Sequence, residues 1–105
     1  MNKEKLEEIS MGLIANSGMA KSSAMMAIQA AKEKDFEKAD EFIEEAQKSL
    51  AIAGQIHMEV IAQEAQGNQV SFSPLYMHSE DQMITAQLAT EFAVEIISLY
   101  KITKS

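Results

Sequence analysis

The segment Tyr76 to Thr85 reads YMHSEDQMIT and gathers side chains that could do chemistry. His78 is followed three and four residues later by Asp81 and Gln82, a spacing that places all three on one face of a helix. Imidazole is nucleophilic near neutral pH, and a buried carboxylate without a cation would bind a proton or a metal ion. Taken from these residues alone, a functional site and a hydrogen-bonded core histidine are both open interpretations.

The same residues begin a stripe that continues along the segment at spacings of three and four. The stripe consists of Thr85, Leu88, Ala89, Phe92, Ile96 and Leu99. This periodicity predicts one face of a helix that packs into a core. The polar turn therefore stands where the pattern expects core.

Other chemistries have less support in the sequence. There is no cysteine, which excludes a disulfide, a thiolate zinc site and a cysteine nucleophile. No Gly-rich phosphate loop, HExxH motif or Glu-x-x-His pair is present. His57 occupies a position where the helical repeat expects an apolar residue, and we interpret it as a packed or interface histidine.

Composition indicates a small helical protein. The chain has 105 residues, of which 47% are hydrophobic and 24% charged, with one proline and four glycines. We therefore expect one domain over residues 1–105 that is all-α. The net charge of −7 argues against binding to nucleic acid. No apolar run reaches the roughly 20 residues of a membrane span, so we expect a cytoplasmic protein with no membrane insertion.

Two breaks divide the chain into helices at about residues 3–33, 35–66 and 74–102. In the second break, Gly67 can end a helix in a left-handed conformation, and Ser73 before Pro74 suits the start of the next. The first break depends on Asp35 alone as a cap. Without it, a helix over residues 3–66 would be about 96 Å long and could not bury its own stripe. We therefore expect an up-down-up three-helix bundle.

The first two helices have stripes of their own. The first consists of Leu6, Ile9, Leu13, Ala20, Ala24, Ala27 and Ala31, and the second repeats every seven residues as Phe36, Ile43, Leu50 and His57 beside Ala39, Ala46, Ala53 and Val60. Strict heptads predict near-parallel packing. Further apolar residues lie off these stripes: Met11, Ile14, Met25, Met26, Ile52, Ile56, Met58, Met83, Ile84, Val94 and Ile97. This surplus favours self-association.

Three motifs in this order resemble the lactose/cellobiose-type IIA component of the bacterial sugar phosphotransferase system. That family reads H-A-Q-D-H-L-M-T-A where this chain has His78-Ser79-Glu80-Asp81-Gln82-Met83-Ile84-Thr85-Ala86. The segments ANSGMAKSSAMMAIQAAKEKDFEKA and LAIAGQIHMEVIAQEAQG are similar to two more family motifs. The resemblance covers roughly residues 9 to 101.

The resemblance implies a cytoplasmic phosphotransferase component that acts in sugar uptake. His78 would accept a phosphoryl group from the phosphocarrier HPr and pass it to a cysteine of the IIB component, which serves the membrane IIC permease. The family also implies a homotrimer, and so a nine-helix assembly. In it, Asp81 from each subunit would meet at the axis around one Mg²⁺ per trimer. Glu80 and Gln82 would support the phosphoryl site.

The chain departs from the family pattern near the expected site. Glu80 replaces a glutamine and Gln82 a histidine, while Gly54 and His57 stand where the family has His and Gln. Lys21 stands for Arg and Lys34 for Gly. These departures leave an alternative function, in which the helical trimer is a regulatory interaction module without phosphoryl transfer.

Overall fold

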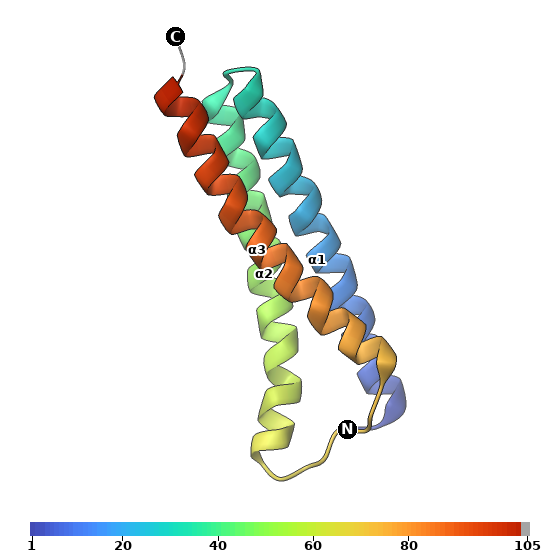
Figure 1. Cartoon of the computed structure of the whole chain (residues 1–105). Coiled ribbons are helices and arrows are strands. Elements are labelled where there is room, and N and C mark those ends of the chain that lie inside the picture. The colour runs from blue at the N-terminus through green and yellow to red at the C-terminus, as the bar shows by residue number, and fades with distance from the viewer. Residues whose placement is uncertain (104–105) are drawn as a thin grey trace.

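The computed structural model describes residues 1–103, which form three helices and no strand (Figure 1). α1 spans Lys3–Lys32, α2 spans Phe36–Ala65 and α3 spans Pro74–Thr103. The helices run up, down and up within a body of 56 × 20 × 18 Å. The all-α three-helix bundle expected from the sequence is therefore confirmed. α1 packs extensively against both other helices, whereas α2 and α3 meet at fewer positions.

α1 and α2 end in the same hydrogen-bonded motif. After α1, Asp35 N donates to Ala30 O and Lys34 N to Ala31 O, each at 3.0 Å. After α2, Asn68 N donates to Gln63 O and Gly67 N to Glu64 O at the same distance. These are the bonds of a Schellman motif, whose central residue is left-handed. That residue is Lys34 at φ 64° in one case and Gly67 at φ 88° in the other.

The starts of the helices use side-chain caps. Asp35 Oδ1 accepts from Lys38 N at 3.2 Å at the start of α2. Ser73 Oγ accepts from Tyr76 N at 3.1 Å directly before Pro74, as the sequence predicted for the start of α3. Residues 66–73 cross from α2 to α3 without secondary structure and are mostly exposed (Figure 1).

The inner faces of α1 and α2 are those expected from the sequence. Every residue of the predicted α1 stripe is buried, and Ala39, Ala46, Ala53 and Val60 of α2 are fully buried. Small residues dominate both faces, so the two helices approach closely. At Gly12, an added Cβ would lie 3.3 Å from Ile56 Cδ1.

The packing face of α3 differs from the expectation. The face buried within the chain is Tyr76, Ser79, Met83, Ala86, Thr90, Ala93 and Ile97. The predicted stripe points outward: Leu88 is 47%, Phe92 59% and Leu99 61% exposed. The stripe is therefore not core within one chain, and core between subunits, which the family resemblance implies, stays a prediction. The placing of Met83 and Ile97 outside the core was wrong. Because α3 is apolar on two sides, its periodicity alone cannot identify the inner one.

No helix within residues 1–103 combines the length and the apolar character that crossing a membrane requires.

Candidate functional site

The expected site lies near the start of α3, at the end of the bundle where α2 finishes (Figure 1). His78 and Asp81 are both exposed. Neither side chain has a hydrogen bond or an ion pair to another residue in the described range 1–103. The His78 imidazole is therefore accessible to a partner without first breaking a contact within the chain.

Gln82 is half-buried and connects α3 to α1. Its Oε1 accepts a hydrogen bond from Lys21 Nζ at 2.7 Å, which leaves its amide N–H groups to donate elsewhere. Gln82 follows His78 by four residues, so the two side chains are neighbours on the helix surface. Lys21 thus brings a positive charge to the side chain that lies one turn along α3 from His78.

Glu80 faces a different side of α3, since residues two apart on a helix do not face each other. Its Oε2 lies 2.7 Å from His57 Nε2 of α2 and accepts from the Tyr76 hydroxyl at 2.9 Å. The rings of His57 and Tyr76 stack with their centroids 6.4 Å apart and an angle of 20° between planes. We call His57, Tyr76 and Glu80 the α2–α3 cluster.

The surroundings of Tyr76 in the α2–α3 cluster raise the pKa of its phenol. Burial, and then the hydrogen bond and the negative charge of Glu80, raise the pKa of the Tyr76 phenol well above its ordinary value of 10.0. Glu64 of α2 adds to this effect. The phenol therefore stays protonated, and so remains a donor to Glu80, throughout the physiological range.

Asp81 supplies one carboxylate, an oxygen ligand of the type that Mg²⁺ prefers. Within residues 1–103 of a single chain, no three His, Asp or Glu side chains are grouped so that they could hold a metal ion. Glu80, the neighbouring acid, is already engaged by His57 and Tyr76. The donor set thus suits a hard cation only if further ligands come from water or from other copies of the chain.

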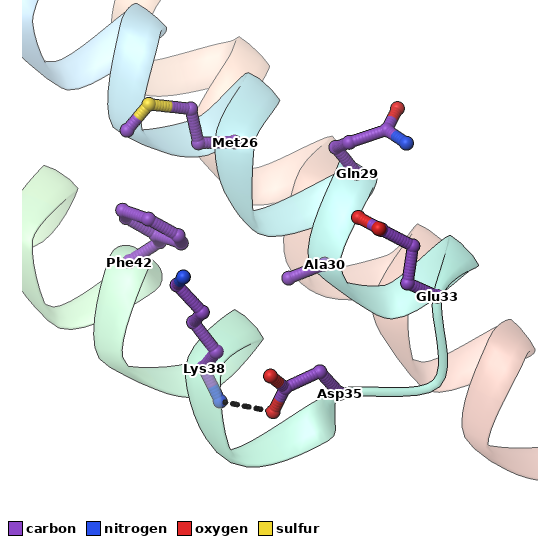
Figure 2. Close-up of a pocket in the computed structure, with 7 residues that line it drawn as sticks. All are labelled: Met26, Gln29, Ala30, Glu33, Asp35, Lys38 and Phe42. Atoms are coloured by element: carbon purple, nitrogen blue, oxygen red, sulfur yellow. Dashed lines mark hydrogen bonds between the residues drawn. The ribbon is translucent and has the colours of Figure 1, made fainter.

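A hollow of about 380 Å³ lies at the opposite end of the bundle, where α1 meets α2 (Figure 2). Two of its polar residues already have local roles. Asp35 caps α2, and Lys38 Nζ sits 5.9 Å from the centre of the Phe42 ring, a cation–π contact. No histidine lines this hollow, so it offers no counterpart to the His78 surface.

Comparison with known proteins decides the family. The model of the family described as "PTS system, Lactose/Cellobiose specific IIA subunit" matches residues 8–101. The chain belongs to this family.

Individual relatives agree with that assignment. A lactose-specific EIIA component of Staphylococcus epidermidis is 32% identical over 101 residues, which cover 96% of this chain and 97% of the relative. A crystal structure of a cellobiose-specific enzyme IIA from Bacillus anthracis has a TM-score of 0.90 at 38% identity, covering 96% of this chain and 91% of that one. The IIA(chitobiose)–HPr complex of Escherichia coli gives a TM-score of 0.83 at 33% identity, covering 95% and 97%. This IIA chain is thus a component of the phosphotransferase system.

The structure brings together some of the predicted site residues and separates others. His78, Asp81 and Gln82 share one side of α3, whereas Glu80 is directed to α2. Lys21 and Tyr76 did not figure as site residues in the sequence interpretation. The spacing of four between Tyr76 and Glu80 is a signal for their contact. The contacts that Lys21 and His57 make across helices depend on the helix register, which the sequence does not give.

Proposed function

We propose that the chain is a cytoplasmic phosphocarrier that accepts a phosphoryl group from HPr on His78 and passes it to the cysteine of a IIB component. The observation that carries this proposal is the His78 imidazole, exposed on α3 and without a partner among the described residues. Family membership supplies the reaction class, and the relative solved in complex with HPr supports HPr as the donor.

The transfer needs positioning rather than a deep pocket. A nitrogen of the neutral His78 imidazole attacks the phosphorus atom, and the new P–N bond forms as the bond to the donor breaks. In the second step, the IIB thiolate attacks the same phosphorus and His78 leaves as imidazole. An exposed histidine suits both steps, because two different proteins must reach it in turn.

Two neighbours of His78 fit this chemistry. Lys21, held on Gln82, provides positive charge for the phosphoryl dianion. The Gln82 amide N–H groups can donate to a phosphoryl oxygen where the family has a histidine. In this proposal, Lys21 and Gln82 together compensate for the family histidine that Gln82 replaces.

We further propose that three copies of the chain assemble through the outward stripe of α3. Leu88, Phe92 and Leu99 together expose an apolar surface that a monomer would leave in water. Asp81 lies on the same side, one and two turns before Thr85 and Leu88, so that three copies would bring three carboxylates to one axis. Mg²⁺ bound there would supply the positive charge that offsets these carboxylates.

The proposed function can be tested by incubating the protein with phosphoenolpyruvate, enzyme I and HPr. We expect an acid-labile adduct of about 80 Da, the mass of a phosphoryl group. His78→Gln should lose the adduct and keep the helical fold, because His78 is exposed. Absence of the adduct with several HPr proteins would instead support a regulatory module without phosphoryl transfer.

A further inference from the structure

α2 and α3 are linked by few polar contacts. In the described part of the chain, two side-chain pairs join them: Asp40 with Lys101 at one end, and His57 with Glu80 at the other. The first pair is largely exposed, whereas the side chains of His57 and Glu80 are 20% and 35% exposed. The end of α3 that carries His78 is therefore joined to α2 through the better shielded pair.

The geometry of the α2–α3 cluster fixes the direction of its hydrogen bonds. Ionised Glu80 can only accept, so both His57 Nε2–H and the Tyr76 hydroxyl must donate to the same oxygen. Glu64 of α2 is a further negative group that acts on the cluster through Tyr76. Among the described residues, His57 is the only group in direct contact with Glu80 that can carry a positive charge.

Without His57 and Tyr76 as partners, the negative charge of Glu80 would oppose phosphoryl transfer to His78. It is two residues from His78, and its side chain can rotate about three torsions. Although Glu80 faces another side of α3, an unpaired carboxylate this near along the helix would still repel the phosphoryl dianion through space. The family motif avoids this problem, because it has uncharged glutamine at both positions where this chain has His57 and Glu80.

We propose that His57 is a positioning residue for phosphoryl transfer, an inference that rests on the proposed function. By donating to Glu80, it fixes the α3 turn that carries His78 and keeps the negative charge of Glu80 on the α2 side. His57 and Glu80 then form a matched replacement for two glutamines.

The test measures single-turnover transfer from phosphorylated HPr to the full chain. His57→Leu removes the donor and should slow transfer by about tenfold, because small misplacements near a reacting group are costly. The double variant His57→Gln, Glu80→Gln should transfer within about twofold of the parent rate. Two amides can bond to each other with no charge to misdirect.

A matched control uses the other α2–α3 pair. Lys101→Leu removes the ion pair to Asp40 and should leave the transfer rate unchanged, since this contact lies at the far end of the bundle. Melting temperatures of all variants show whether a slow variant is also unstable. Recovery of the rate in the double variant is the result that a purely structural role of His57 would not give.

The outcomes separate the two proposals. If the parent chain takes no phosphoryl group on His78, the proposed function fails and this inference fails with it. If the parent is phosphorylated but His57→Leu is equally fast, or the double variant is as slow as His57→Leu, only this inference is overturned. Should His57→Leu not fold, His57→Ala also removes the donor to Glu80 and must be slower than the double variant, and equal rates would refute the role of His57.

Discussion

At the scale of single residues, four of the five helical positions from 78 to 82 point to three different surroundings. His78 and Asp81 face out, Glu80 is bound to α2 through His57, and Gln82 is bound to α1 through Lys21. The residues beside His78 thus hold its turn from two sides while leaving the imidazole accessible. Such an arrangement ties the turn to both neighbouring helices without covering the His78 imidazole.

Tyr76 offers a direct measurement of one of these contacts. Tyr76→Phe removes the hydroxyl donor to Glu80 and should lower the free energy of unfolding by about 1 kcal/mol at pH 7. The pKa of Tyr76 is raised in the folded chain, so the unfolded chain loses this proton first as the pH rises. Its contribution to stability is therefore present below about pH 10 and declines above it.

Urea denaturation at about pH 8 and pH 11 checks both statements. The parent chain should lose more stability between these values than Tyr76→Phe does. A difference of the same size in both proteins would show that Tyr76 is not the group responsible.

Residue chemistry was only partly predictable. The i, i+3 and i, i+4 spacings identified the shared side of His78, Asp81 and Gln82, because helix geometry alone fixes it. The partners of Glu80 and Gln82 were not predictable, because His57 and Lys21 lie on other helices. Their contacts depend on the register in which the helices pack, which the sequence does not specify.

At the scale of elements, the two helix C-termini make the same motif with different residues. Gly67 adopts the left-handed conformation freely, whereas Lys34 adopts it with a Cβ that crowds the backbone. The sequence therefore showed the end of α2 clearly and the end of α1 weakly. The break near Lys34 had to be inferred from the length that an unbroken helix would have.

Lys34→Gly should relieve this crowding and raise the free energy of unfolding by about 0.5 to 1 kcal/mol. Glu33→Gly is the matched control, since Glu33 has φ −88° and gains nothing from glycine. It should be neutral or destabilising. Thermal denaturation of both variants checks the prediction, which would be wrong if the two changed stability alike.

α3 differs from the other helices because it is apolar on two sides. Its inner face includes small residues such as Ser79, Ala86 and Ala93, while larger apolar side chains lie outside. A hydrophobicity pattern gives more weight to the larger side chains, and it therefore selected the wrong face as the core of a single chain. The existence of the helix was predictable, but its orientation was not.

Leu88→Asp tests whether the outward stripe is an interface. Leu88 is 47% exposed, so the helical content should survive, but a charge on a shared apolar surface should prevent assembly. Sedimentation should show a monomer for Leu88→Asp and an assembled protein for the exposed neighbour variant Gln87→Asp. A normal trimer for Leu88→Asp would argue against this interface.

At the scale of the whole molecule, a single chain leaves two surface features without a partner. It leaves an apolar stripe open along α3 and presents a single carboxylate at Asp81. Both features are accounted for by the proposed trimer. The sequence predicted the surplus of apolar surface, although two of the residues it assigned to that surplus, Met83 and Ile97, belong to the core of the single chain.

Asp81→Leu tests the proposed metal site. Replacing converging buried charges by apolar groups is often neutral or stabilising by about 1 to 4 kcal/mol, so the variant should remain a trimer. Removing divalent cations with EDTA should lower the melting temperature of the parent and leave that of Asp81→Leu unchanged. A monomeric Asp81→Leu would contradict the placement of this residue at the axis.

The exposed connection between α2 and α3 also offers a site for proteolytic cleavage of the chain. Phe72 is 82% exposed there, so chymotrypsin could cut at this point and separate a hairpin of α1 and α2 from an α3 peptide. The inner face of α3 is buried by its packing on the hairpin, and the two fragments should stay associated after the cut. A synthetic α3 peptide carrying a stable phosphohistidine analogue at position 78 could then be docked on an unmodified hairpin, giving a semisynthetic form that permanently mimics the proposed phosphorylated state.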